Sequence, residues 1–227
     1  MKGFFTPLAL AVKRDDHAMV KYLLSKGAEV DKGGGGNNST TPLIEACRMA
    51  RPNVKVVREL LAAKADPDAA FHAASRTDAY LPLHLAASRG DAEIVALLLE
   101  HGADPTRPSG KGSRERTPLE WLVHTPGDTV GPRQVSQVAK LLIEAGADVN
   151  IRTEDGRTPL MSMAERGWTE PVKALLDLGA DPLLMDKGGM TARALAANKE
   201  HWGVVTILKQ AEEEARSAPE DAPSGAD

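Results

Sequence analysis

LPLHLAASRGDAEIVALLLEHGADP, residues 81–105, has the pattern of two short helices separated by a glycine turn. Pro82 suits the first position of a helix, where its missing N–H loses no hydrogen bond. Gly90 interrupts the chain, and Asp91 can cap a second helix whose apolar residues recur at helical spacing. Gly102 fits the left-handed conformation that ends a helix. The segment therefore predicts a helix–turn–helix unit with an apolar face that it cannot bury alone.

Weaker copies of this segment recur along the whole chain. Thr-Pro-Leu or a related triplet begins at positions 6, 41, 81, 117, 158 and 191, so the spacings are 35, 40, 36, 41 and 33 residues. A leucine marks the second helix of each copy: Leu23, Leu60, Leu98, Leu141, Leu175 and Leu208. Gly-Ala-Asp or a relative ends five copies, at 27–29, 64–66, 102–104, 146–148 and 179–181. Such a period predicts stacked units that share one continuous core.

These triplets resemble the ankyrin repeat family, whose mark is Thr-Pro-Leu-His-x-Ala at a 33-residue period. The third copy matches best, with Leu81 in place of threonine, and the resemblance covers roughly residues 3–210. It implies an all-α solenoid, an ankyrin repeat array of helix pairs with short β-hairpin fingers and a concave inner face. The six expected copies are 3–31, 38–68, 78–105, 114–150, 155–182 and 188–210. Residues 211–227 are expected to hold the end of the last helix and a disordered acidic tail.

Several features depart from the family pattern. Arg193 takes the place of a core leucine in the last copy, as in a terminal repeat with one face in water. The first copy starts almost at Met1, so we expect Phe4 and Phe5 either to be partly exposed or to cover its open end. An exposed end would fit a chain that docks on something. The extra residues at 124–132 are interpreted either as drift with local repacking or as a functional loop. The glycines at 33–36 lack the lysine of a phosphate loop and indicate a flexible finger tip.

Composition narrows the function classes. The formal net charge of −4 gives no overall attraction to nucleic acid or to an anionic membrane. Cys47 is the single cysteine, which excludes an internal disulfide and a cysteine-based metal cluster and favours a reducing compartment. The apolar run near the N-terminus is too short for a signal peptide or a membrane span. We therefore expect a cytoplasmic protein, with the nucleus as the alternative.

No constellation of residues predicts catalysis. His84 and His201 occupy positions that are structural in the ankyrin family, and no histidine pair has the spacing of a zinc protease. Cys47 falls in a small-residue column, which indicates a buried hydrophobic side chain rather than a nucleophile. The prediction is a chain that is not an enzyme and that uses no cofactor and no metal ion.

Basic and aromatic residues are the candidate contacts for a partner. The eighth residue after the anchor is basic in four copies, Arg14, Arg89, Arg166 and Lys199, and this basic column is expected along one lip of the concave groove. The second finger adds Arg76 and Tyr80, the third adds Arg107, Lys111, Arg114 and Arg116, and two tryptophans, Trp121 and Trp168, complete the set. The alternative is that the basic column is a solvated helix face and that the tryptophans only pack between repeats.

The predicted function is a non-enzymatic scaffold or adaptor that binds another protein through its concave face and finger loops. We expect the partner's contact surface to be acidic and the chain to be monomeric alone, with no small-molecule substrate and no membrane insertion. One alternative is a targeting or regulatory subunit of a separate enzyme. Another is a nucleic-acid-binding adaptor that uses the basic third finger, against which the net charge argues.

Residues 142–150 raise a question of modification. They resemble the ankyrin segments that asparaginyl hydroxylases modify, which makes Asn150 the expected site of hydroxylation. The alternative is that Asn150 only shapes the turn.

Overall fold

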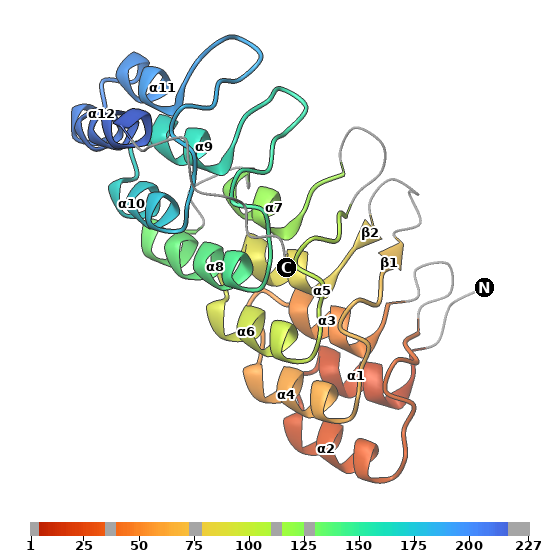
Figure 1. The fold of residues 1–227 in the computed structure, drawn as a ribbon. Helices are drawn as coiled ribbons and strands as arrows, with labels where there is room; N and C mark the ends of the chain where they lie inside the picture. Colours follow the sequence, from red (N-terminus) through yellow and green to blue (C-terminus); the bar gives the residue numbers. More distant parts are fainter. Residues whose placement is uncertain (1–4, 35–39, 73–78, 110–114, 125–129, 218–227) are drawn as a thin grey trace, which may run out of the picture. The chain divides into compact units, whose positions relative to one another are not determined.

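The structure of the chain is a computed structural model that describes residues 5–34, 40–72, 79–109, 115–124 and 130–217. At 71–72, 79–80 and 124 it describes the backbone alone. The chain divides into two compact units, Met1–Asp148 and Val149–Asp227. Helix pairs build both of them (Figure 1).

The first unit holds four helix pairs arranged in two rows (Figure 1). The first helices of the pairs are α1 (Pro7–Lys13), α3 (Pro42–Arg48), α5 (Pro82–Ser88) and α7 (Pro118–His124). The second helices are α2 (His17–Ser25), α4 (Val54–Ala62), α6 (Ala92–Glu100) and α8 (Pro132–Glu144). Each helix packs against its own partner and against the next helix of its row, so the core lies between neighbouring pairs.

The second unit holds two pairs of the same kind. These are α9 (Pro159–Glu165) with α10 (Thr169–Asp177), and α11 (Ala192–Asn198) with α12 (Trp202–Ser217). Helix α9 packs on α11 and α10 packs on α12, which repeats the arrangement within the first unit. The prediction of an all-α repeat array of helix pairs is thereby confirmed.

Threonine caps and prolines start most of the first helices. The Thr6 side-chain oxygen accepts a hydrogen bond from the Ala9 N–H, and the threonines before α3, α9 and α11 do the same. Leu81, which takes this place before α5, makes no such bond. A threonine cap stabilises a helix by about 1 kcal/mol, so α5 depends more on the packing of its neighbours.

The core consists of columns of apolar residues that repeat from pair to pair. Leu98 in α6 and Leu142 in α8 are both fully buried. The sequence pattern had pointed to Leu141, which is only half-buried. The buried position is found by counting back from the glycine that follows the second helix. The buried leucine lies four residues before Gly102 in the third copy and four residues before Gly146 in the fourth.

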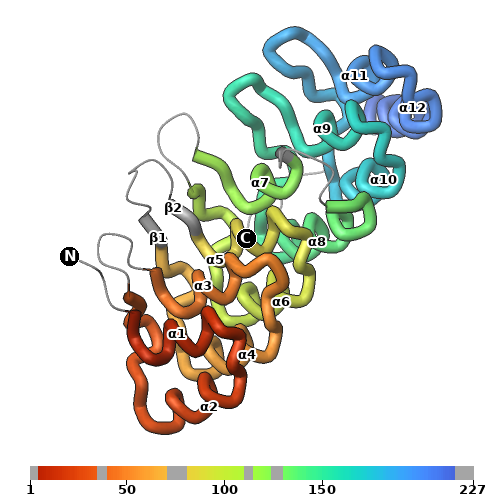
Figure 2. Tube along the Cα trace, turned by 180° about the vertical axis from the view of Figure 1, so that it is seen from behind, coloured from red at the N-terminus to blue at the C-terminus, as the bar shows by residue number. Residues whose placement is uncertain are grey.

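Hairpins precede the first helices and form the finger bases. Strand β1 (Phe71–His72) pairs antiparallel with β2 (Ala79–Tyr80). Three other fingers close through single bridges: Gly34 with Thr40, Ser109 with Arg116, and Met185 with Thr191. Before α9, the Thr153 N–H donates to the Arg157 carbonyl instead. In the first unit these bases lie along one edge of the row of first helices (Figure 2). Gly33 has to be glycine, because a Cβ there would collide with the Thr40 carbonyl. The predicted finger tips at 35–39, 73–78 and 110–114 lie outside the described residues.

Carboxylate and amide side chains link the turn of one repeat to the turn of the next. In each link a side-chain oxygen accepts a backbone N–H at distances of 2.9–3.3 Å: Asp31 from Asp66, Asp68 from Asp104, and Asn150 from Asp181. Because one residue column supplies all three acceptors, the links set the offset between neighbouring repeats. Asn150 therefore has a structural contact in addition to any modification.

The last repeat ends on an ion pair. Arg193, in the place of a core leucine, donates from Nε to Glu212 Oε2 at 2.9 Å. The Glu212 side chain is 3% exposed and that of Arg193 is 41% exposed. Glu212 belongs to the part of α12 that continues where the other copies turn at Gly-Ala-Asp. A charged pair thus closes this end of the second unit.

Replacing Asn150 tests the link between turns. We expect Asn150→Ala to lower the free energy of unfolding by about 0.5–1.5 kcal/mol, because the Asp181 N–H loses its acceptor. Asn150→Asp is the matched control and should stay close to the parent, since Asp31 and Asp68 accept the same bond in other repeats. Chemical denaturation measures both changes. Equal losses in the two variants would contradict the role of the side-chain acceptor.

Candidate functional site

The basic column of the sequence lies at the C-caps of the first helices. Arg14 caps α1 and Arg89 caps α5 in the first unit. Arg166 caps α9 and Lys199 caps α11 in the second. Each cap is separated from the hairpin before its helix by the length of that helix. A helix of seven residues is about 10 Å long. The basic column and the fingers therefore lie at opposite ends of the first helices within each unit.

Arg89 is bound within the first unit. Its guanidinium donates to the Cys47 carbonyl and, at 2.6 Å, to the Arg48 carbonyl, at the end of α3. Those carbonyls have no helical partner and carry the negative end of the helix dipole, so a cation there stabilises the fold. Arg14 is exposed and has more freedom to meet a partner.

The basic residues of the third finger do not form one cluster in the described part of the chain. Arg107 donates from Nη1 to the Asp68 carbonyl at 3.0 Å, which fixes it near the turns between repeats. Arg116 pairs through its backbone with Ser109 at the finger base, and its side chain is half-exposed. Lys111 and Arg114 lie outside the described residues, as does Arg76 of the second finger. Tyr80 is described only by its backbone, which pairs with Phe71.

His84 and Trp121 hold the base of the third finger. The His84 Nε2–H donates to the Arg116 carbonyl at 3.0 Å, and the ring meets Trp121 edge to face with centroids 5.9 Å apart. His84 is fully buried, and burial lowers its pKa from 6.5 to about 4, so the ring is neutral. Trp121 is half-buried. Its position fits packing between repeats and leaves part of the ring open.

In the second unit, the turns between first and second helices carry the aromatic and basic candidates. The Arg166 guanidinium lies over the Trp168 ring at 5.0 Å from its centroid, a cation–π contact. Lys199 is exposed, and Trp202, which was left out of the predicted set, is 64% exposed. His201 donates to the Glu165 carbonyl at 3.1 Å and has the structural role that the resemblance implies.

Exposed apolar residues in the first repeat were also absent from the predicted set. Leu10, Met19 and Tyr22 are all exposed, and they lie on α1 and α2. The corresponding residues of the third repeat, Leu85, Ile94 and Leu97, are buried.

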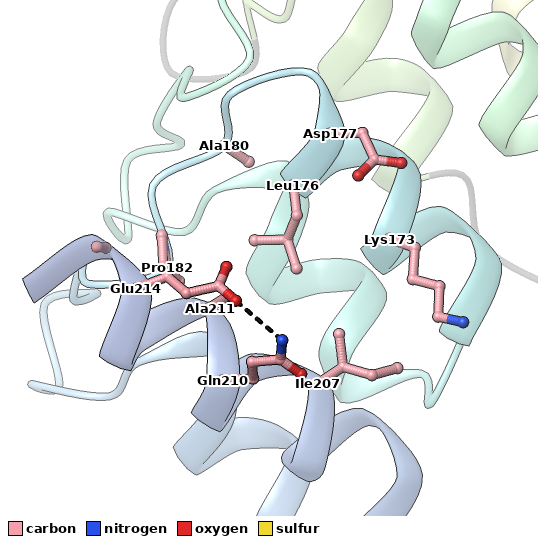
Figure 3. A pocket seen from close by; sticks show the side chains of 10 residues that line it. Lys173, Leu176, Asp177, Ala180, Pro182, Ile207, Gln210, Ala211 and Glu214 are labelled. Atoms are coloured by element: carbon pink, nitrogen blue, oxygen red, sulfur yellow. Dashed lines mark hydrogen bonds between the residues drawn. The ribbon is translucent and has the colours of Figure 1, made fainter. Parts of the chain in front are cut away.

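A hollow of about 460 Å³ lies between the second helices α10 and α12 (Figure 3). Leu176, Ile207 and Pro182 supply its apolar lining, and Lys173 and Asp177 stand at its rim. Gln210 and Glu214 are hydrogen-bonded to each other along the α12 side at 2.9 Å. The hollow is therefore lined by the two second helices and the turn after α10. The predicted contacts lie elsewhere, on fingers and first helices.

Metal-ligating side chains and the cysteine were compared with the expectations from the sequence. None of the described His, Cys, Asp and Glu side chains gather into a possible metal site. Cys47 is buried, and burial raises the pKa of its thiol to about 12, which keeps it protonated and unreactive. No helix among the described residues has the length and apolarity needed to span a bilayer.

Known proteins are similar to the chain over most of its length. The family model described as ankyrin repeats (3 copies) matches residues 2–71, 35–109 and 133–217. Ankyrin repeat protein nuc-2 of Neurospora crassa is 32% identical over 78% of this chain and 15% of its own length. Ankyrin repeat and SOCS box protein 16 of mouse is 29% identical, covering 82% of this chain and 46% of its own. Putative palmitoyltransferase ZDHHC13 of zebrafish is 32% identical, covering 78% and 25%. The chain thus spans less than half of each relative.

The buried histidine predicts a dependence of stability on pH. Because the His84 pKa is about 4 when folded and 6.5 otherwise, the unfolded chain binds more protons between these values. The free energy of unfolding should therefore fall as pH drops from about 6.5 to 4, by up to about 3 kcal/mol. His84→Gln keeps an N–H for the Arg116 carbonyl but does not titrate. Urea denaturation across this range should show a smaller fall in the variant, and identical pH profiles would disprove the assignment.

Proposed function

The chain belongs to the ankyrin repeat family, and from this premise we propose that it is a non-enzymatic scaffold or adaptor for another protein. Ankyrin repeats mediate protein–protein interaction. The proposal rests on where the two kinds of side chain lie in the repeats. Apolar columns are buried, while basic and aromatic side chains lie at the ends of first helices and at the finger bases. The contact surface that we propose is the concave face and finger loops expected of the family.

The proposed contacts follow from which side chains the fold leaves available. Arg14 and Lys199 are exposed, and Arg116 is half-exposed. Arg89 and Arg107 are bound to backbone carbonyls and belong to the framework instead. Trp121 and the pair of Arg166 and Trp168 are proposed as aromatic contacts that pack within the fold and meet the partner at their open edges.

The proposed partner is a protein with an acidic contact surface. Arginine and lysine favour carboxylates, and arginine can bind them through two parallel hydrogen bonds. Each exposed pair contributes only about 0.2–1 kcal/mol, but several together accelerate association. We propose no cofactor, no small-molecule substrate and no nucleic acid, and we place the protein in the cytoplasm, with the nucleus as the alternative.

A second candidate function is that of a targeting or regulatory part of an enzyme. The similarity to a protein named as a putative palmitoyltransferase favours it, because the match covers a quarter of that relative. In this case the repeats would bind the catalytic part or its substrate through the same surface. Co-purification of the chain with an enzymatic activity would separate this function from that of an independent adaptor.

Charge reversal tests the proposed surface. Partners are first captured from the native cell and identified by mass spectrometry. The triple variant Arg14→Glu, Arg116→Glu and Lys199→Glu should then lower the affinity for the identified partner by at least about tenfold, which is 1.4 kcal/mol of binding free energy. It should also make Kd less dependent on salt concentration. The control carries Lys55→Glu, Arg133→Glu and Lys173→Glu, exposed positions on second helices with the same change of net charge. Equal effects of the two triples would place the site elsewhere.

Hydroxylation of Asn150 is a separate proposal. The side-chain oxygen accepts the Asp181 N–H at 2.9 Å, and a hydroxyl group on Cβ would leave that oxygen in place. Intact-peptide mass spectrometry of the protein from its own cell should show a gain of one oxygen on the peptide that holds Asn150. Unmodified peptide throughout would leave Asn150 with its structural contact alone.

A further inference from the structure

The hollow between α10 and α12 combines an apolar lining with charged walls (Figure 3). Leu176 and Ile207 are half-buried, so they keep apolar surface that a ligand can cover. Asp177 stands on the α10 wall and Glu214 on the α12 wall, and both residues are exposed. Because both walls are helices of the second unit that pack on each other, the hollow belongs to one compact unit.

The continuation of α12 forms one wall of the hollow. Helix α10 ends at Asp177, where the chain turns, whereas α12 continues to Ser217. Ala211 and Glu214 lie on this continuation and line the hollow, as does Pro182 in the turn after α10. The turn of the fifth repeat is therefore bordered by a helix, and the hollow lies between the two.

The charged lining of the hollow is negative in sum, because two carboxylates stand against one ammonium group. Gln210 Nε2 donates to Glu214 Oε1 at 2.9 Å, and this neutral donor orients the carboxylate without removing its charge. Asp177 is the last residue of α10, where the helix dipole adds a negative partial charge. A cation is therefore the complementary group for the carboxylates of the hollow.

Lys173 is the ammonium group of the lining, and it lies one helical turn before Asp177 on α10. In α8 the equivalent residues, Lys140 and Glu144, are paired at 3.7 Å. The shorter Asp177 forms no ion pair within the part of the chain that the structure describes. Its carboxylate is therefore open to a cation from outside.

We propose that this hollow docks a short amphipathic α-helix of a partner protein that carries leucine and arginine side chains. Leucine would cover Leu176 and Ile207, and arginine would pair with Asp177 and Glu214. A helix fits this arrangement, because its apolar side chains recur on one face and its arginines reach outward from both flanks. The site is separate from the surface of fingers and first-helix ends, for which the proposed partner is acidic.

The test uses a synthetic helical peptide with leucines at i, i+3, i+4 and i+7 and arginines along both flanks. Its binding to the full chain is followed by fluorescence anisotropy. Asp177→Lys with Glu214→Lys should weaken binding by at least about tenfold. Glu100→Lys with Glu144→Lys is the matched control, because these exposed acids also end second helices and give the same change of net charge. The control should stay within about twofold of the parent, and circular dichroism checks the folding of both variants.

Filling the hollow tests the apolar contact separately from charge. Ala211→Phe places a ring where a leucine of the peptide would lie, so it should weaken binding by at least about tenfold. Ala211 is half-buried, and thermal unfolding checks that the variant is folded. Ala215 is exposed on the same wall, so Ala215→Trp serves in its place if Ala211→Phe does not fold.

A second peptide tests the charge of the partner. With glutamate in place of every arginine it should bind at least about tenfold more weakly than the basic peptide. No measurable binding of the basic peptide, equal binding of the two peptides, equal losses in the two lysine double variants, or full binding by the folded variant with a filled hollow would overturn the proposal. Sedimentation that shows a dimer abolished by Asp177→Lys with Glu214→Lys would assign the hollow to a second copy and would also overturn it.

Discussion

Burial of apolar side chains between neighbouring repeats is the interaction on which the rest of the structure depends. The helices of the third repeat have seven and nine residues, and helices this short are marginal in water by themselves. Leu98 is fully buried in α6, which packs between α4 and α8. Burial of one leucine contributes about 1.5–3 kcal/mol, so each repeat is stable chiefly through its neighbours. The two ends of such an array therefore differ from its interior for a physical reason.

Close stacking then determines the roles of the polar groups. Helix ends and turns of adjacent repeats come within hydrogen-bond distance, and their backbone groups need partners. Asp68 accepts a hydrogen bond from the backbone of the next turn, and Arg89 donates to a carbonyl at the end of α3. His84 donates to a carbonyl at the base of the third finger. These side chains would be surface groups in an isolated helix pair. In the array they join the framework, which holds the exposed residues at fixed spacing.

The sequence was sufficient for elements whose causes are local. Pro82, Gly90 and Gly102 predict where the helices of the third repeat begin and end, because they act on their own backbone. Leu141 was misassigned because an insertion made counting from the anchor unreliable, whereas the distance to Gly146 was constant. The internal contact of Arg89 could not be predicted, since its acceptors lie more than forty residues earlier, at Cys47 and Arg48. Column periodicity also says nothing about which repeat lacks a neighbour.

The same reasoning separates two kinds of surface on the chain. Along the sides of the repeats, Arg14 and Lys199 are exposed at the ends of first helices. Met19 and Tyr22 of the first repeat are exposed where the third repeat buries Ile94 and Leu97, whereas Arg193 and Glu212 form an ion pair in the last repeat. The overall charge of −4 is a sum over the whole chain and does not describe the local charge at either surface. The recognition surface that we propose consists of exposed side chains such as Arg14 and Lys199, which the stacked core does not bury.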